Sequence, residues 1–420
     1  MNITITPTRL EGTVTPPPSK SQAHRALIAA ALADGESVIS NVALSQDIEA
    51  TLNCLDGLGA RFERDGNTVT VHGMAASAMS PLRRLAYPHL DCGESGSTLR
   101  FLIPIALAVR GGGIFTGRGR LMERPLAPYF DLFNEKGIFY ELKDGALTVT
   151  GMLTPGEYRL PGDVSSQFVT GLLYALPLRD GDSEIVLTSP LESRGYVDMT
   201  LYALEDFGIT VEERKNGFFI PGRQIYQPRP FTVEADWSQA AFWCAAKELG
   251  CALEVQGMLD TDSVQWDRII RHHAQELAHP GNVDIDVSDC PDLVPPLAVM
   301  AALREGEVTR LTNAARLRIK ESDRLATVTQ VLNALGASVM EYPDSLAIYG
   351  KDSLAGGVKV NSFNDHRIAM MAAIAATRCE QPVTVQGAEC VAKSYPNFWE
   401  DYEALGGLLF LERKSNQKEL

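Results

Sequence analysis

Apolar and polar residues follow a repeating plan along the chain, and paired glycines mark the repeats. Four glycines each end a helical pattern, and a second glycine follows each of them 14 residues later. The pairs are Gly59 and Gly73, Gly137 and Gly151, Gly208 and Gly222, and Gly336 and Gly350. Between the glycines of a pair lies a polar turn flanked by alternating residues, which predicts a β-hairpin. Because glycine is a favourable helix C-cap, each repeat is predicted to run helix, strand, helix, hairpin.

The repeats become less regular in the second half of the chain. Three repeats occupy about 19–222, and the later ones begin at Asp236, Asp292 and Asn364. The last repeat has no full hairpin at its end. The chain's own start, at 3–15, shows the alternation expected of the missing strands. We therefore expect the first strands of the chain to pair with its last repeat.

This pattern predicts two domains of three repeats each. One domain covers 19–227, and the other combines 1–18 with 228–420. A chain of 420 residues, 45% of them hydrophobic, is long enough for two α/β cores. Prolines lie at both expected crossings between the domains, at 16–18 and 228–230, and a pair of stiff crossings predicts a hinge.

Charge and cysteine content exclude several classes of protein. The formal net charge is −15, and no basic run could neutralise the phosphates of a nucleic acid or of an anionic membrane. The longest apolar runs, such as 26–33 and 368–377, are shorter than the roughly 18 residues that span a bilayer. Seven cysteines without paired spacing argue against disulfides and against a zinc site. We expect a cytoplasmic monomer that binds neither nucleic acid nor membrane.

The first helix of each repeat is preceded by a cluster of polar residues or glycines. In the first three repeats these clusters are 19–25, 93–100 and 162–167. A helix N-terminus presents free N–H groups and a partial positive charge, so it favours anions. Any one cluster could be an ordinary helix cap. Their recurrence at equivalent positions predicts that the helix starts share an anionic ligand.

The stretch 317–325 carries charged residues among apolar ones, near the start of a predicted helix. In a helix, Lys320 and Arg324 would share one face, with Glu321 about 100° away. The stretch is then either a solvated helix face with a Glu321–Arg324 pair or part of a binding site. Similar chemistry at other helix starts favours the binding site.

Seven short motifs, in order along the chain, carry a resemblance to a known family. They are Pro18-Ser19-Lys20-Ser21 with Arg25, Gly96-Ser97-Thr98-Leu99-Arg100, Glu123-Arg124-Pro125, Ser165-Ser166-Gln167, Lys320-Glu321-Ser322-Asp323-Arg324, Asn364-Asp365-His366-Arg367 and Lys393-Ser394-Tyr395-Pro396. With this combination the whole chain resembles the 5-enolpyruvylshikimate-3-phosphate synthases, a family of enolpyruvyl transferases. The resemblance implies an α/β fold of two domains, each with three βαβαββ-type repeats in an inside-out α/β barrel, and a cleft at the domain interface.

The resemblance also implies a reaction of the shikimate pathway, which leads to the aromatic amino acids. The enolpyruvyl group of phosphoenolpyruvate moves to the 5-hydroxyl of shikimate 3-phosphate, and phosphate is released. Both substrates carry a phosphate and a carboxylate, so the site needs several Arg and Lys side chains. No cofactor and no metal are needed, and the sequence has no ligand cluster with zinc spacing.

Site residues follow from the matching motifs. By resemblance, phosphoenolpyruvate binds Lys20, Gly96, Arg124, Gln167, Arg324, Arg367 and Lys393. Shikimate 3-phosphate binds Ser21, Arg25, Ser165, Ser166, Gln167, Ser193, Tyr196, Asp292, Arg316 and Lys320. Arg316 stands where some members have an asparagine that contacts the shikimate ring. Gly96 lies in the loop where glyphosate competes with phosphoenolpyruvate, so the resemblance makes the chain a glyphosate target.

Two carboxylates suit the proton transfers of this reaction. By resemblance, Asp292 accepts the proton of the hydroxyl and Glu321 delivers a proton to the methylene carbon. Lys20 and His366 are further candidates for these roles. Two plainer roles stay open: Asp292 as the N-cap of a helix at 293–303, and His366 as a hydrogen-bonded support of the neighbouring helix start.

Two other functions remain to be compared with this one. The first is the enolpyruvyl transferase that acts on UDP-N-acetylglucosamine, a family that carries a reactive cysteine on a mobile loop. The corresponding loop here, 116–124, contains no cysteine. The second is a non-catalytic anion-binding repeat protein, which would need no paired acid and base such as Asp292 and Glu321.

Overall fold

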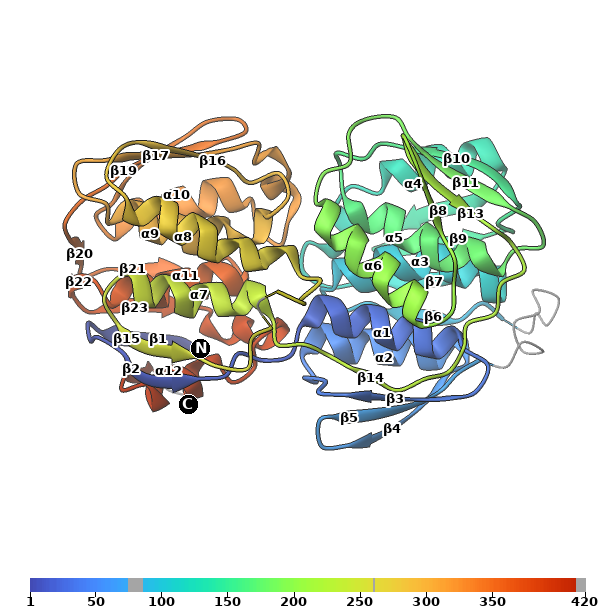
Figure 1. The fold of residues 1–420 in the computed structure, drawn as a ribbon, viewed down its shortest axis with the longest axis horizontal. Coiled ribbons are helices and arrows are strands. Elements are labelled where there is room, and N and C mark those ends of the chain that lie inside the picture. Colours follow the sequence, from blue (N-terminus) through green and yellow to red (C-terminus); the bar gives the residue numbers. More distant parts are fainter. Residues whose placement is uncertain (75–85, 260, 413–420) are drawn as a thin grey trace, which may run out of the picture. The chain divides into compact units, whose positions relative to one another are not determined.

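The protein folds into two compact units (Figure 1). A computed structural model describes residues 1–74, 86–259 and 261–412. Unit 1 comprises Met1–Pro17 and Ala235–Leu420, and unit 2 comprises Pro18–Glu234. The second crossing therefore lies after Glu234, later than the expected end of the domain at Gln227. The reason is a short strand at Phe231–Thr232 that pairs in parallel with Glu36–Ser40 and so belongs to unit 2.

Unit 2 contains three repeats of helices and strands. Its elements are α1 (Lys20–Leu32), β3 (Glu36–Ser40), α2 (Gln46–Leu58), β4 (Arg61–Asp65), β5 (Thr68–His72), β6 (His89–Asp91), α3 (Gly96–Arg110), β7 (Gly112–Thr116), the 3-10 helix η1 (Leu121–Glu123), α4 (Ala127–Lys136), β8 (Phe139–Lys143), β9 (Ala146–Thr150), β10 (Gly156–Leu160), α5 (Ser166–Ala175), η2 (Leu176–Leu178), β11 (Ser183–Leu187), α6 (Arg194–Asp206), β12 (Glu212–Arg214), β13 (Gly217–Ile220) and β14 (Phe231–Thr232). They form three four-stranded sheets with the orders β14-β3-β5-β4, β6-β7-β9-β8 and β10-β11-β13-β12. In each sheet the first two strands are parallel and the hairpin adds two antiparallel strands.

The predicted helix C-cap is confirmed for two of the four paired glycines, whereas Gly208 and Gly336 directly follow the C-caps Phe207 and Leu335. Gly59 and Gly137 are the C-caps of α2 and α4, with left-handed φ values of 118° and 65°. The predicted hairpins are confirmed as β4–β5, β8–β9 and β12–β13 in unit 2. After the first hairpin, a Cβ on Gly73 would lie only 2.0 Å from the carbonyl oxygen of Ala33. The second glycine of that pair thus allows two backbone segments to approach closely.

Unit 1 is built from the remaining repeats. Its elements are β1 (Asn2–Thr6), β2 (Glu11–Val14), α7 (Trp237–Glu248), β15 (Ala252–Val255), η3 (Trp266–Ile269), α8 (Ile270–Ala278), β16 (Val283–Asp286), η4 (Pro291–Leu293), α9 (Val294–Ala302), β17 (Val308–Thr312), η5 (Ala315–Ile319), α10 (Arg324–Ala334), β18 (Ser338–Glu341), β19 (Leu346–Tyr349), β20 (Leu354–Gly356), β21 (Lys359–Asn361), α11 (His366–Ala376), β22 (Cys379–Gln381), β23 (Val383–Gln386), η6 (Ala388–Lys393), α12 (Phe398–Ala404) and β24 (Leu408–Glu412). The sheet β16-β17-β19-β18 repeats the strand order of unit 2.

The N-terminal strands complete unit 1. Strand β1 lies between β23 and β24 and is antiparallel to both, so the last repeat receives its fourth strand from the start of the chain (Figure 1). Strand β2 pairs in parallel with β15 of the irregular fourth repeat. The alternation at 3–15 predicts this pairing, because one face of each N-terminal strand must be buried. Ile3 and Ile5 supply that buried face in β1.

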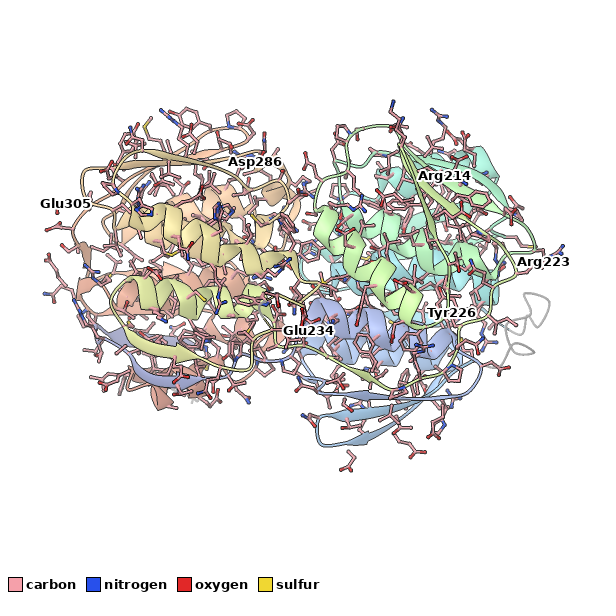
Figure 2. The ribbon with its side chains drawn as sticks, in the orientation of Figure 1. Arg214, Arg223, Tyr226, Glu234, Asp286 and Glu305 are labelled. Carbon is pink, nitrogen blue, oxygen red and sulfur yellow. The ribbon has the colours of Figure 1, made fainter. Side chains whose placement is uncertain are left out.

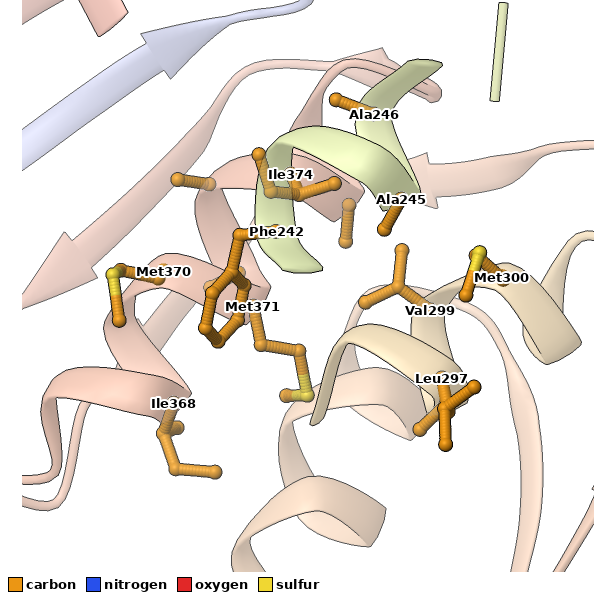
Figure 3. Packing of buried hydrophobic residues seen from close by; sticks show 14 of the residues in the cluster. Phe242, Ala245, Ala246, Leu297, Val299, Met300, Ile368, Met370, Met371 and Ile374 are labelled. Atoms are coloured by element: carbon orange, nitrogen blue, oxygen red, sulfur yellow. The ribbon is translucent and has the colours of Figure 1, made fainter. Parts of the chain in front are cut away.

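Each core forms around helices that are buried on most sides. In unit 1 the helices α7, α9 and α11 meet through apolar side chains, among them Phe242, Leu297 and Met371 (Figure 3). In unit 2 the hydroxyl of Tyr174 on α5 donates a hydrogen bond to the carbonyl of Arg25 on α1. The outer hairpin strands, such as β4 and β8, are mostly exposed. Helices inside and small sheets outside give the inside-out α/β arrangement that the resemblance implies.

Charged side chains lie on the outer surface of both units (Figure 2). Arg223 in unit 2 and Glu305 in unit 1 are exposed examples, whereas Tyr226 is buried. In the described part of the chain, no helix combines the length and the apolar character needed to cross a membrane.

Candidate functional site

In unit 1, Arg324 binds three carboxylates and is only 1% exposed. Its Nε donates to Asp365 at 2.9 Å, its Nη1 to Asp292 at 2.7 Å and its Nη2 to Glu321 at 2.6 Å. A buried guanidinium needs a carboxylate partner, since an unpaired buried charge is very costly. The three carboxylates together raise the pKa of Arg324 against the opposing effect of burial. The solvated-face interpretation of the stretch 317–325 is therefore wrong, although the Glu321–Arg324 pair does form.

The predicted helical relation between Lys320 and Arg324 is also wrong. Helix α10 begins at Arg324, and its N-cap is Asp323, whose side chain accepts from the backbone N–H of Ala326. Lys320 ends the preceding 3-10 helix η5 in an extended conformation. The Asp323 cap stops the helix from extending towards Lys320, because an N-cap residue has non-helical dihedral angles. The two cations meet through a shared carboxylate and not through a shared helix face.

That shared carboxylate is Asp292, which lies in η4 just before α9. It accepts from Arg324 and, at 2.9 Å, from Nη2 of Arg367, and the Nζ of Lys320 lies 3.8 Å away. The N-cap of α9 is Leu293, and no side chain caps this helix, so the capping role considered for Asp292 is wrong. Burial raises the pKa of Asp292, but Arg367, Lys320 and Arg324 outweigh it and hold the pKa well below its usual value. Asp292 is therefore ionised at neutral pH.

The pKa of Lys320 is also lowered, but here burial is the dominant cause. Burial lowers its pKa from 10.5 to about 8, against the attraction of Asp292, which raises the pKa. The ammonium group therefore begins to lose its proton just above neutral pH. Nearby, an Nη of Arg316 donates to the backbone carbonyl of Ser288, which fixes this side chain within unit 1.

The start of α11 brings further predicted residues to the same cluster. Asp365 caps the helix by accepting from the backbone N–H of Arg367 at 3.0 Å, and it also accepts from Ser322 at 3.0 Å. Arg367 donates to the hydroxyl of Ser238 at 3.0 Å, near the start of α7. The starts of α7, α9 and α11 thus converge within unit 1, as their polar clusters predict.

The remaining predicted residues of unit 1 lie beside this helix start. Lys393 donates from Nζ to the backbone carbonyl of Asn364 at 2.6 Å and is buried. His366 is the first residue of α11 and is also buried. Its neighbour Asp365 makes the cap of the helix, so the helix start is held by the carboxylate.

In unit 2 the predicted residues gather at the starts of α1, α3 and α5. Ser19 caps α1, and Lys20 directly after it donates to Asp47 of α2 at 2.8 Å. Sequence reasoning missed Asp47, because a carboxylate in the first turn of a helix is already explained by the helix dipole. Both side chains of this pair are mostly buried, so Asp47 holds Lys20 in one position.

Arg25 brings together residues from two distant parts of unit 2. Its three nitrogens donate to the carbonyl of Ser21 at 2.7 Å, the carbonyl of Tyr196 at 2.7 Å and the hydroxyl of Thr200 at 2.9 Å. Burial lowers the pKa of Arg25 to about 10, which leaves it charged at neutral pH. Ser193, the N-cap of α6, adopts a left-handed conformation with φ of 54° and is buried. Such a backbone is uncommon for a residue other than glycine and is often found at functional positions.

Gly96 is the first residue of α3, and three polar side chains surround it. A Cβ at Gly96 would lie 2.8 Å from Nη1 of Arg124, 3.1 Å from Nη1 of Arg100 and 3.5 Å from Oε1 of Gln167. Arg100 donates to Gln167 at 2.7 Å, and Gln167 donates to the hydroxyl of Ser97 at 3.0 Å. The structure therefore brings Gly96, Arg124 and Gln167 together, as expected.

The start of α5 completes this group. Ser165 is the N-cap of α5 and accepts from the backbone N–H of Gln167 at 3.3 Å, and Ser166 is the first residue of the helix. Arg100 belongs to a recognised motif and to the cations expected in the cleft, but to neither set of predicted substrate-binding residues. Its bond to Gln167 could be found only from the fold, because the two residues are 67 positions apart.

The two clusters differ in their charge. The cluster of unit 2 contains four cations, Lys20, Arg25, Arg100 and Arg124, and one paired carboxylate, Asp47. The cluster of unit 1 combines Lys320, Arg324, Arg367 and Lys393 with the carboxylates Asp292, Glu321 and Asp365. The first cluster is suited to bind anions, and the second can also donate or accept protons. In residues 1–74, 86–259 and 261–412, no group of three or more His, Cys, Asp or Glu side chains is arranged to hold a metal ion.

Comparisons with known proteins agree on one family. The sequence model described as EPSP synthase (3-phosphoshikimate 1-carboxyvinyltransferase) matches residues 5–265 and 261–402. A 3-phosphoshikimate 1-carboxyvinyltransferase of Clostridium kluyveri is 48% identical over 96% of this chain and 97% of its own length. One from Clostridium beijerinckii is 44% identical over 97% of this chain and 98% of its own length.

Solved structures give the same result for the fold. The EPSP synthase of Acinetobacter baumannii superposes with a TM-score of 0.78 at 25% identity, over 98% of this chain and all of that one. The enolpyruvyl transferase NikO of Streptomyces tendae gives a TM-score of 0.74 at 19% identity, over 97% of this chain and 98% of that one. The second likeness concerns the fold alone.

Proposed function

The chain belongs to the EPSP synthase (3-phosphoshikimate 1-carboxyvinyltransferase) family, and from this premise we propose that it transfers the enolpyruvyl group of phosphoenolpyruvate to the 5-hydroxyl of shikimate 3-phosphate. Phosphate is the second product. The observation that carries the proposal is the pair of carboxylates, Asp292 and Glu321, bound to the same buried guanidinium of Arg324. The fully buried Asp365 already balances the charge of Arg324, so charge balance of this guanidinium does not by itself require Asp292 and Glu321 as well.

Phosphoenolpyruvate is an anion at both ends, and the cations of the two clusters match it. We assign Lys20, Gly96, Arg124 and Gln167 of unit 2, and Arg324, Arg367 and Lys393 of unit 1, to this substrate. A planar guanidinium holds a carboxylate through two parallel bonds, so Arg324 and Arg367 suit the carboxylate. Lysine acts as a point charge and suits phosphate, which we assign to Lys20 and Lys393.

Shikimate 3-phosphate needs hydroxyl groups and backbone N–H groups as well as cations. We assign to it Ser21, Arg25, Ser165, Ser166, Gln167, Ser193 and Tyr196 of unit 2, and Asp292, Arg316 and Lys320 of unit 1. The bonds from Arg25 to the backbone of Ser21 and Tyr196 support a common role for these three residues. The N-terminus of α5 offers N–H groups to the phosphate of this substrate.

The first half of the reaction adds the 5-hydroxyl to carbon 2 of phosphoenolpyruvate while a proton is added to its methylene carbon. Asp292 accepts the hydroxyl proton, and Glu321 delivers the proton to carbon. Before substrate binds, Asp292 is a weak base, because Arg367, Lys320 and Arg324 hold its pKa low. A substrate carboxylate that takes up N–H groups of these two arginines weakens their pull on Asp292 and so increases its basicity.

The second half of the reaction removes a proton from the new methyl group as the carbon–oxygen bond to phosphate breaks. Glu321 accepts this proton and returns to its first state, and Lys20 and His366 are the further candidates for these proton transfers. The proton that Asp292 took from the hydroxyl leaves with the phosphate, so both carboxyl groups return to their first state. The residues of the chain supply all the acid and base groups that these reaction steps need.

Release of phosphate in the presence of both substrates tests the proposal. Purified protein should release one phosphate for each shikimate 3-phosphate consumed, and omission of either substrate should abolish the release. UDP-N-acetylglucosamine in place of shikimate 3-phosphate should give no phosphate, since the loop 116–124 carries no cysteine. Turnover with that acceptor alone would contradict the proposal.

Three finer assignments belong to the same proposal. We propose that the protein works in the cytoplasm. We also propose that it works as a monomer, and sedimentation at working concentration would test the oligomeric state. We also propose that glyphosate competes with phosphoenolpyruvate, because Gly96 leaves the space beside Arg124 open. A competitive pattern against phosphoenolpyruvate in steady-state kinetics would support this assignment.

A further inference from the structure

A row of buried polar side chains connects three helices of unit 2 and includes none of the binding residues assigned above. Nδ1 of His24 on α1 lies 2.8 Å from Oγ1 of Thr51 on α2, which in turn lies 2.6 Å from Oγ1 of Thr98 on α3. Thr98 donates to Oγ of Ser95 at 2.7 Å, and Ser95 caps α3. The first three side chains are fully inaccessible, and Ser95 is 1% exposed. Buried polar groups are costly unless they are hydrogen-bonded, so the loss of one hydrogen bond in this row would destabilise the fold.

The hydrogen bonds of the row run in one direction. A hydroxyl has a single proton, so the bond from Thr98 to Ser95 requires Thr51 to donate to Thr98. Thr51 can then only accept from His24, which places the imidazole proton on Nδ1. Nε2 of His24 is buried and has no hydrogen-bond partner among the described residues, which suits a bare acceptor better than an N–H group. Burial, together with Lys20 and Arg25, lowers the pKa of His24 well below its ordinary value, so the ring stays neutral.

Both ends of the row lie next to residues assigned to phosphoenolpyruvate. Lys20 precedes His24 by four residues, which is about one turn of α1. Gly96 directly follows Ser95. In the middle of the row, the hydroxyl of Thr98 also lies 3.5 Å from the backbone carbonyl of Asp47, whose carboxylate holds Lys20. The row therefore joins the helix that carries Lys20 to the helix that starts at Gly96.

We propose that His24, Thr51, Thr98 and Ser95 are positioning residues that hold the start of α3 in a fixed place relative to Lys20 and thereby set the affinity for phosphoenolpyruvate. None of them touches the substrate. The inference rests on the proposed function, in which Gly96 and Lys20 bind phosphoenolpyruvate. Binding of shikimate 3-phosphate depends on Arg25 and on the starts of α5 and α6. Its affinity is therefore much less sensitive to the position of α3.

The test compares two substitutions at Thr51. Thr51→Val keeps the shape of the side chain and removes the hydroxyl, so the Kd and KM for phosphoenolpyruvate should rise about five- to tenfold, while the KM for shikimate 3-phosphate changes less than about twofold. Thr51→Ser keeps the hydroxyl and removes a buried methyl group, so it should restore the affinity even though it lowers the melting temperature. If the row had a purely structural role, the serine variant would bind phosphoenolpyruvate no more tightly than the valine variant.

The matched control is Thr384→Val in unit 1. Thr384 bonds to Thr4 at 2.8 Å between β23 and β1, so this variant also loses one threonine–threonine hydrogen bond. Both its KM values should stay at the wild-type level. If Thr51→Val is insoluble, Ser95→Ala removes the last acceptor of the row and should give the same selective rise.

The outcomes separate the inference from the proposed function. An unchanged affinity for phosphoenolpyruvate in Thr51→Val, or equal losses for both substrates, would overturn the positioning role. A wild-type protein that binds phosphoenolpyruvate but releases no phosphate would overturn the proposed function, and direct titration of phosphoenolpyruvate would still test the row. A wild-type protein that does not bind phosphoenolpyruvate would overturn both.

Discussion

Replacement of Arg324 by lysine tests whether the buried guanidinium binds phosphoenolpyruvate. The substitution keeps the charge but replaces a planar fork by a single ammonium group. In the structure the fork reaches Asp365, Asp292 and Glu321 at once, from three different nitrogens. An ammonium group cannot reach three carboxylates that are arranged around a plane, so Arg324→Lys loses at least one charged hydrogen bond inside the protein.

The magnitude for phosphoenolpyruvate follows from the second parallel bond to its carboxylate, which a guanidinium can make and an ammonium group cannot. A hydrogen bond to a charged group contributes about 1.5–3 kcal/mol, and we expect phosphoenolpyruvate to lose about 1–3 kcal/mol of affinity. This corresponds to an increase of roughly 5- to 150-fold in its KM at saturating shikimate 3-phosphate. The affinity for shikimate 3-phosphate should change much less, because its cations Arg25 and Lys320 remain. The melting temperature should also fall, since Asp365 is fully buried and loses its bond to Nε.

Arg318→Lys is the matched control, because Arg318 lies in the same stretch and is also paired with carboxylates. It bonds to Asp323 and Glu341, but its side chain is 30% exposed. Exposed pairs contribute at most about 1 kcal/mol, so this variant should keep both KM values. Equal KM values for phosphoenolpyruvate in Arg324→Lys and wild-type protein would remove Arg324 from the substrate site.

Three more predictions concern single residues of the clusters. Glu321→Gln keeps the bond to Arg324 but cannot deliver a proton, so kcat should fall on the order of 10² while shikimate 3-phosphate still binds; normal turnover would reassign the proton donor. Gly96→Ala places a methyl group 2.8 Å from Nη1 of Arg124, so the KM for phosphoenolpyruvate should rise about 5- to 30-fold with an unchanged melting temperature; an unchanged KM would show that this space is not used. Because burial lowers the pKa of Lys320 to about 8, kcat/KM for shikimate 3-phosphate should fall as the pH rises through 8, where the ammonium loses its proton. Lys320→Arg should move this alkaline limb to higher pH, and a limb that stays in place would exclude Lys320 as its cause.

The repeating architecture could be predicted from the sequence because each of its signals is local. A glycine that ends a helix needs a left-handed φ, and this requirement is visible at Gly59 and Gly137 without any tertiary contact. The alternation at the N-terminus predicts strands, and the incomplete last repeat indicates where they pair. The second crossing was misplaced because β14 has only two residues and directly follows the prolines at 228 and 230, so it has no periodic pattern to detect.

The geometry of the charged cluster could not be predicted, because it depends on helix boundaries and distant contacts. Helical spacing suggested a shared face for Lys320 and Arg324, but the capping bond of Asp323 starts the helix four residues later. Asp47 and Asp365 each lie at a helix start, where a carboxylate is accounted for by the helix dipole or by capping alone. Only the fold shows that Asp47 holds Lys20 and that Asp365 holds Arg324.

The carboxylates of both clusters explain why the site is ordered before substrate binds. Several cations close together repel one another, so a cluster that awaits an anion is unstable unless other negative charges are present. Asp47 offsets Lys20 in unit 2, and Asp292 offsets Arg324 and Arg367 in unit 1. Asp365 is fully buried and caps a helix, so it keeps its place when substrate arrives, whereas Asp292 and Glu321 are 17% and 18% exposed and can give up a bond to an arginine. The more exposed carboxylates are the two that must change their protonation during the proposed reaction, and the buried one holds the arginine that binds them.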